Sequence, residues 1–392
     1  MPRNHSRRIL SLIYSISLLA FNYGIWRYLS QNSKHSGVFK FDETVDYLIY
    51  YTNFIVLFTI AMKGLQQTES LKLCVKKMHE IDKTLETLGS SLSFNKIYKK
   101  TMMELLLFLS FVTFLFVITG IQLVSLYTTY ILLLPVVYLN IIHYGYTFMV
   151  EFLLVFEFCT MVRCIKSEFQ RANDLLSDVN ILPMTSIASE LIERSFLVDS
   201  NKLFDLSSSF HKMHSRLQVA SHKLNRSKKL LRTIRQVHLE LYRISKSFGN
   251  MYGIQMSLEI AVCIICNTHL LYHLYDIFLN QKLSNSGKNF ALFTTITACL
   301  QYTIRIFAVN YICDRTTDEA ERTNEIIHTF YGKNTDPAIR KEVEIFSIQL
   351  MQCHTSYSAF GLYNFGCKHI CSCIGVIATY VVIMVQVGNS LK

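Results

Sequence analysis

Residues 370–388 read ICSCIGVIATYVVIMVQVG, an apolar run that carries three polar residues at intervals of seven. Ser372, Thr379 and Gln386 therefore return to nearly the same side of a helix and form one polar stripe, with Gly375 and Ile383 between them. Unpaired polar side chains are costly against hydrocarbon, so a helix surrounded only by lipid would gain nothing from this stripe. We expect the stripe to face other protein, or water inside a membrane.

The composition is that of a membrane protein. Of the 392 residues, 51% are hydrophobic and only 17% are charged, and the mean hydropathy is +0.27. Seven segments approach or exceed the ~20 residues that a helix needs to cross a bilayer. They are 9–28, 45–62, 102–124, 131–162, 252–275, 290–312 and 368–388. We predict an all-α membrane protein with seven transmembrane helices. The first segment lacks a small-x-small cleavage site, so we interpret it as a retained anchor rather than a signal peptide.

The basic residues predict the orientation of the chain. If the amino terminus is cytoplasmic, the segments between spans place 31 Lys and Arg residues in the cytoplasm and 6 outside. This asymmetry follows the positive-inside rule in every loop. The topology also explains the net charge of +11, so we expect no nucleic-acid partner. All eleven cysteines fall in spans or cytoplasmic segments, so the sequence indicates no disulfide framework.

The lengths of the segments between spans indicate how the chain is organised. Spans one to four occupy residues 1–162 and spans five and six occupy 252–312, while the last span lies in 366–392. Between them, 163–251 is expected to extend helices four and five into the cytoplasm, with a turn within 180–200. The second cytoplasmic segment is 313–365. We therefore expect long helices that continue from the membrane into a cytoplasmic domain.

A separate cytoplasmic helix is predicted for 336–361. Asp336 is a natural N-cap, Pro337 suits the first helical position, and Gly361 can end a helix. The apolar positions between them share one face, and they are Ile339, Val343, Phe346, Leu350, Cys353 and Tyr357. A helix with such a face requires a partner, either in the same subunit or in another.

Four charged residues lie inside predicted spans, and they are Glu151, Glu157, Glu259 and Arg305. Isolated charges are expensive in a bilayer, so we expect these residues to pair between helices. A structural role is favoured over ligand contact.

The carboxyl-terminal run resembles the signature of the insect gustatory receptor family. Thr379 and Tyr380 are followed by five hydrophobic residues and then by Gln386, as in that signature. The preceding segments 346–350 and 360–363 resemble its usual lead-in. One position departs from the pattern, because Val387 stands where the family usually has Phe.

This resemblance implies a tetrameric, ligand-gated, non-selective cation channel, in which the seventh span lines a central pore and the cytoplasmic helices anchor the subunits. It implies a gate at Gln386 and Val387, which Ile383 could share, with Thr379 and Ser372 along the conduction path. Tyr380 is expected to pack against a neighbouring span. The resemblance also implies a multi-pass protein in the plasma membrane of sensory neurons, in dendrite, axon and cell body, where a taste substance binds.

The ligand pocket is expected among the exterior halves of spans two to six, in the part of the chain that includes 1–162. Its candidate residues are Tyr51, Gln122, Tyr138, His143, His269, Thr297 and Gln301. These side chains carry few charges and suit small neutral or weakly basic organic molecules, bitter compounds at least as well as sugars. His269 and His273 have metal-ligand spacing, but no third ligand is identifiable, so neither a metal nor a cofactor is expected.

Three other classes are less well supported. A receptor acting through G proteins would place the basic segments on the wrong side of the membrane, and its acidic-Arg-Tyr and Asn-Pro-x-x-Tyr motifs are absent. A secondary transporter would be expected to show internal repeats and broken spans. An enzyme would need a catalytic motif, and no phosphate loop, Gly-x-Ser-x-Gly or His-Glu-x-x-His occurs.

Overall fold

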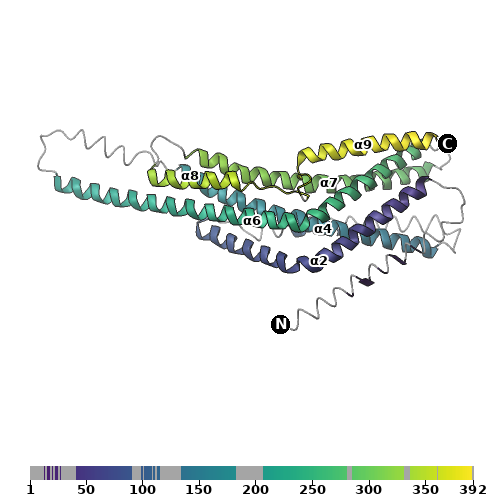
Figure 1. Cartoon of the computed structure of the whole chain (residues 1–392), viewed down its shortest axis with the longest axis horizontal. Helices are drawn as coiled ribbons and strands as arrows, with labels where there is room; N and C mark the ends of the chain where they lie inside the picture. The colour runs from purple at the N-terminus through teal and green to yellow at the C-terminus, as the bar shows by residue number, and fades with distance from the viewer. Residues whose placement is uncertain are drawn as a thin grey trace.

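The computed structural model describes residues 41–90, 134–181, 206–279, 285–330, 336–359 and 361–390, together with short pieces within 13–27 and 99–114. The helices with described bounds are α2 (Phe41–Thr87), α4 (Leu134–Ile181), α6 (Leu206–Leu279), α7 (Asn285–His328), α8 (Pro337–Gln352) and α9 (Cys367–Ser390). Figure 1 shows an elongated bundle in which α6 runs from end to end, with α8 and α9 packed toward opposite ends. The all-α prediction is confirmed for these residues.

Several helices are much longer than a bilayer is thick. The 74 residues of α6 span about 110 Å, whereas a bilayer core is about 30 Å thick. Among the described residues, three helical stretches are long and apolar enough to cross a membrane: Leu224–Leu279, Ala291–His328 and Cys367–Ser390. Most of the predicted spans 9–28 and 102–124 lies outside the described residues.

The long helices share one hydrophobic core that extends along the bundle. It includes buried residues such as Leu85 of α2, Phe169 of α4, Leu241 of α6 and Ile327 of α7, each fully or almost fully shielded from solvent. Burial of an apolar side chain of this size contributes roughly 1.5–3 kcal/mol. The core therefore fixes α6 and α7 as the surface on which α8 and α9 pack.

The start of α8 is as predicted, but its end is not. Asp336 caps the helix, because its Oδ1 accepts a hydrogen bond from the Ala338 N–H at 2.8 Å, and Pro337 is the first helical residue. The helix ends at Gln352, nine residues before Gly361. Beyond this end, Ser358 Oγ accepts a hydrogen bond from the Gly361 N–H at 3.3 Å, which favours a turn over a further turn of helix.

Between α8 and α9, the described residues 353–359 and 361–366 form an extended segment with a tight reversal. The Phe365 N–H donates to Tyr357 O at 2.8 Å, and the Ala359 N–H donates to Tyr363 O at 2.9 Å. Gly361 occupies the left-handed region at φ +76°, which glycine adopts without strain. This reversal buries Tyr357 and Phe365, a gain that continuing α8 would forgo.

An aromatic cluster joins this segment to the core. Phe158 of α4 lies with its ring centroid 5.5 Å from Phe248 and 6.0 Å from Tyr252, both on α6. Tyr357 and Phe365 approach the same ring at 6.4 and 6.5 Å. Edge-to-face pairs of this kind add about 0.5–1.5 kcal/mol each beyond the burial of their surface. The connection into α9 is therefore tightly held.

Candidate functional site

The last helix, α9, has two distinct faces. The side chains that pack on the bundle are buried or partly buried, and they are Ile370, Cys373, Ile377, Val381, Met384 and Gly388. They recur at intervals of three and four, as expected for one side of a helix. This face lies against α6 and α7 of the same chain.

The polar stripe lies on the opposite side of α9. At about 100° per residue, Ser372, Thr379 and Gln386 lie roughly 160° around the helix from the packed face. All three are exposed, and Ile383 and Val387 beside them are 45% and 37% exposed. The Thr379 hydroxyl donates to Gly375 O at 2.9 Å, so its proton is hydrogen-bonded within the helix. The stripe therefore faces away from the subunit's own core.

The packing of Tyr380 against a neighbouring span stays a prediction. Its side chain is 56% exposed rather than packed against another helix of this chain. It lies at the edge of the outward face, about 100° from Thr379. The ring lies about 60° around the helix from the centre of the packed face, so it borders the residues that contact α6 and α7 without being covered by them.

The first turn of α9 is attached to α7 by polar contacts. The Gly366 N–H donates to Asn310 Oδ1 at 3.0 Å, and His369 Nδ1 lies 3.0 Å from the same oxygen. The Cys367 N–H donates to Asp314 Oδ1 at 3.3 Å. Asn310 and Asp314 thus accept hydrogen bonds from backbone N–H groups that the start of a helix leaves unpaired. Sequence reasoning missed these two residues, because the contact joins positions more than fifty apart.

The last turn of α9 is attached to α6. A Cβ atom placed on Gly388 would lie 2.5 Å from the Tyr272 hydroxyl oxygen, so a larger residue here would have to displace the tyrosine ring. The next residue, Asn389, donates from Nδ2 to the Tyr275 hydroxyl at 3.2 Å. Gln386 and Val387 therefore lie within one turn of a fixed point on the subunit.

A buried ion-pair cluster connects α4, α6 and α7. Arg305 Nη1 lies 2.6 Å from Glu259 Oε1 and 3.0 Å from Glu151 Oε2, and all three residues are at most 3% exposed. The guanidinium carbon also lies 4.6 Å from the centre of the Phe148 ring. These contacts confirm the predicted pairing between helices. Glu157 instead accepts a hydrogen bond from the Tyr252 hydroxyl at 2.8 Å.

The predicted ligand-binding residues are only partly described. Gln122 lies outside the described residues, as do the side chains of Tyr138 and His143 on α4. Tyr51 on α2 is 53% exposed. Thr297 on α7 is half-buried and donates to its own helix at Phe293 O, 2.7 Å away.

The two remaining candidates lie on neighbouring helices. Gln301 on α7 and His269 on α6 are both half-buried, and the His269 and His273 rings are nearly parallel with centroids 6.5 Å apart. Within the described part of the chain, no three His, Cys, Asp or Glu side chains are grouped so as to hold a metal ion. The pocket that these residues were expected to line remains a prediction.

Comparison with known proteins shows the family to which the chain belongs. A sequence profile of the family described as 7tm Chemosensory receptor matches residues 2–388. The putative gustatory receptor 28b of Drosophila melanogaster is 20% identical over 379 residues, which cover 95% of this chain and 76% of that protein. The gustatory receptor for sugar taste 43a of the same species is 22% identical over 230 residues, which cover 59% and 52%.

Solved structures show the same fold. The insect olfactory receptor OR5 from Machilis hrabei superposes with a TM-score of 0.56 at 11% identity, over 96% of this chain and 89% of the receptor. Its complex with eugenol gives a TM-score of 0.54 at 12% identity, over 97% and 88%. The resemblance first noticed at Thr379–Gln386 thus extends over nearly the whole sequence. This protein belongs to the 7tm chemosensory receptor family, whose members are receptors and channels rather than enzymes.

Proposed function

We propose that this protein is a ligand-gated, non-selective cation channel in which α9 from each of four subunits lines a central pore. The observation that carries the proposal is the polar stripe of Ser372, Thr379 and Gln386, which faces away from the subunit's own core. A stripe of hydroxyl and amide groups keeps a transmembrane path hydrated, whereas the packed face of the same helix is apolar. Four copies arranged with these stripes inward would enclose such a path.

The gate in this proposal lies near the carboxyl end of α9. Ile383 and Val387 are both exposed, and in the helical projection they lie on the same side of Gln386, about 60° and 100° from it. A ring of four apolar side chains can close a pore by excluding water. The contacts of Gly388 with Tyr272 and of Asn389 with Tyr275 would transmit movements of α6 to this ring.

The proposed channel has seven spans and a cytoplasmic amino terminus. The excess of Lys and Arg in the segments assigned to the cytoplasm supports this orientation. In that arrangement the far ends of α2, α4, α6 and α7, together with α8, form the cytoplasmic anchor between subunits. We place the receptor in the plasma membrane of sensory neurons.

The proposed ligand is a small neutral or weakly basic organic molecule. The half-buried His269, Thr297 and Gln301 support a pocket on α6 and α7 with hydrogen-bonding groups and few charges. Bitter compounds fit this chemistry, and so do sugars, since one relative is a gustatory receptor for sugar taste. A calcium-imaging screen across both classes in cells expressing the full chain distinguishes them.

Whole-cell recording during ligand application tests the pore. We expect Gln386→Ala to alter gating or permeation, and Val387→Phe to lower the current without ligand because a larger ring seals better. Ile377→Val on the packed face is the matched control and should leave permeation unchanged. Unaltered currents in both pore variants would argue against a pore along this stripe.

A further inference from the structure

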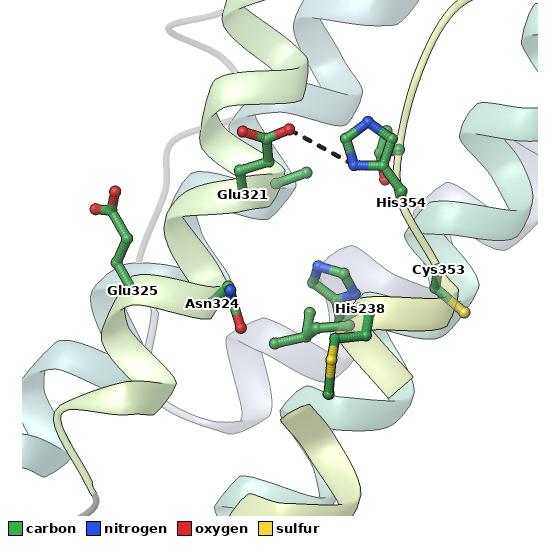
Figure 2. A pocket seen from close by; sticks show the side chains of 10 residues that line it. His238, Glu321, Asn324, Glu325, Cys353 and His354 are labelled. Carbon is green, nitrogen blue, oxygen red and sulfur yellow. Dashed lines mark ion pairs between the residues drawn. The ribbon is translucent and has the colours of Figure 1, made fainter. Parts of the chain in front are cut away.

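A cavity of about 430 Å³ lies where α6, α7 and α8 meet, at the end of the bundle remote from the proposed gate. Its volume falls within the range of small-molecule sites. Figure 2 shows His238 of α6 in the middle of this region, with Asn324 and Glu325 of α7 to one side and the Glu321–His354 pair above. The cavity is separate from the residues predicted to bind the taste ligand.

Two buried polar side chains that line this cavity have unpaired atoms. His238 is 2% exposed; one ring nitrogen is directed at the Ala320 backbone at the limit of a hydrogen bond, and the other has no partner among the described residues. Thr355 is 3% exposed, and its Oγ1 has no hydrogen-bond partner either. Each such group costs about 1–3 kcal/mol, so their occurrence on one cavity wall requires an explanation.

The position of His238 is held by packing rather than by hydrogen bonds. Its ring meets Phe169 edge-on with centroids 5.1 Å apart, and Phe346 of α8 at 5.8 Å. Burial against two aromatic rings disfavours the charged imidazolium, so the neutral ring offers one donor and one acceptor. The two nitrogens point away from each other, so a ligand hydroxyl can pair with one of them and exchange its other hydrogen bond with Thr355.

The mouth of the cavity is acidic. Glu321 and Glu325 are exposed carboxylates on α7, one turn apart, and His354 Nδ1 lies 3.5 Å from Glu321 Oε1. Leu350 and Met351 of α8 also line the cavity and supply apolar surface. Because the described residues include no group of three ligands suited to a metal ion, an organic cation fits the cavity better than a metal.

We propose that this cavity binds a small organic ammonium compound that also carries a hydroxyl group. The ammonium group pairs with Glu321 and Glu325, the apolar body contacts Leu350 and Met351, and the hydroxyl satisfies His238 and Thr355. Thr355 belongs to the segment that leads from α8 through Tyr357 to α9, so occupancy bears on the attachment of the last helix. By the predicted topology, the site opens to the cytoplasm.

Isothermal titration of the purified full-length receptor in nanodiscs tests this proposal. The probe is 4-hydroxyphenethylamine, with phenethylamine and 4-ethylphenol as analogues that lack the hydroxyl or the amine. We expect saturable binding of the probe and at least about tenfold weaker binding of each analogue, which corresponds to the loss of about 1.4 kcal/mol. Equal binding of 4-ethylphenol, or no saturation by the probe at about 10 mM, would overturn the proposal.

Near-isosteric variants distinguish a ligand site from a merely structural one. His238→Phe and Thr355→Val remove the unpaired polar atoms, so we expect thermal stability that is unchanged or higher, together with about tenfold weaker probe binding. Glu321→Gln combined with Glu325→Gln should weaken the binding of the probe but not the binding of 4-ethylphenol. Glu344→Gln on the exposed side of α8 is the control. Wild-type affinity in both the His238 and the Glu321/Glu325 variants contradicts the assignment.

Discussion

Replacing Arg305 with leucine removes the cation that faces Glu151 and Glu259 in the middle of the bundle. Both carboxylates are 1% exposed, and one oxygen of each already lacks a hydrogen-bond partner. Two acidic groups then remain in an apolar setting with no compensating charge. Breaking a buried ion pair in this way costs about 3–5 kcal/mol, because the surviving charge is desolvated and unpaired.

The corresponding shift in melting temperature follows from the size of the chain. At about 2.1 cal/mol/K per residue, 392 residues give an unfolding entropy of about 0.8 kcal/mol/K. A loss of 3–5 kcal/mol then lowers the melting temperature by about 4–6 °C. Arg322→Leu provides a matched control on the same helix, since its ion pair with Glu319 is 47% exposed on the arginine side and contributes at most about 1 kcal/mol.

The assay is a thermal melt of the detergent-solubilised receptor, followed by size-exclusion chromatography with fluorescence detection. Adding Glu151→Gln and Glu259→Gln to Arg305→Leu should recover much of the lost stability, because no buried charge remains. If Arg305→Leu melts at the same temperature as Arg322→Leu, the cluster does not hold α4, α6 and α7 together. A triple variant no more stable than the single one would contradict the role of unpaired charge.

Two further predictions concern packing and pH. Gly388→Ala should destabilise the receptor by about 1–3 kcal/mol in the same melt, because the added Cβ would overlap the Tyr272 hydroxyl. Gly375→Ala is the control and should be neutral, because a Cβ there meets open space. Equal melting temperatures of the two variants would disprove the close approach. Burial raises the pKa of Glu168 from 4.5 to about 7, although Arg171 opposes this shift. The folded carboxyl therefore holds its proton to higher pH than the unfolded one. The protonated Glu168 carboxyl therefore adds roughly 3 kcal/mol at most to the free energy of unfolding. This stabilisation is complete below about pH 4 and disappears as pH rises through about 7. Melts between pH 5 and 8 should lose this slope in Glu168→Gln, and an unchanged slope would assign it to other groups.

Periodic patterns in the sequence predicted the parts of the molecule that depend on local spacing. The interval of seven between Ser372, Thr379 and Gln386 placed them on one exposed face because seven residues make almost two full turns of a helix. Asp336 and Pro337 predicted the start of α8 because capping involves only neighbouring backbone groups. The charge of Arg305 predicted a buried partner because an isolated charge is too costly there.

Contacts between distant segments could not be predicted in the same way. The end of α8 depends on Tyr357 and Phe365 reaching Phe158, which is about two hundred residues earlier in the chain. The attachment of Gly366 to Asn310 likewise has no local signal, because nothing in the sequence distinguishes Asn310 from the other polar residues of α7 as the partner of the start of α9. The cavity around His238 brings together three helices whose relative placement only the fold provides.

The accessibility of single cysteines along α9 tests the central claim about this helix most directly. In a background with the exposed Cys367 and Cys371 replaced by serine, Thr379→Cys and Ile377→Cys place a thiol on the outward and the packed face respectively. A membrane-impermeant methanethiosulfonate reagent, applied while ligand holds the channel open, should block current through Thr379→Cys and leave Ile377→Cys unaffected. Protection of Thr379→Cys together with block of Ile377→Cys would contradict a water-filled path along the polar stripe.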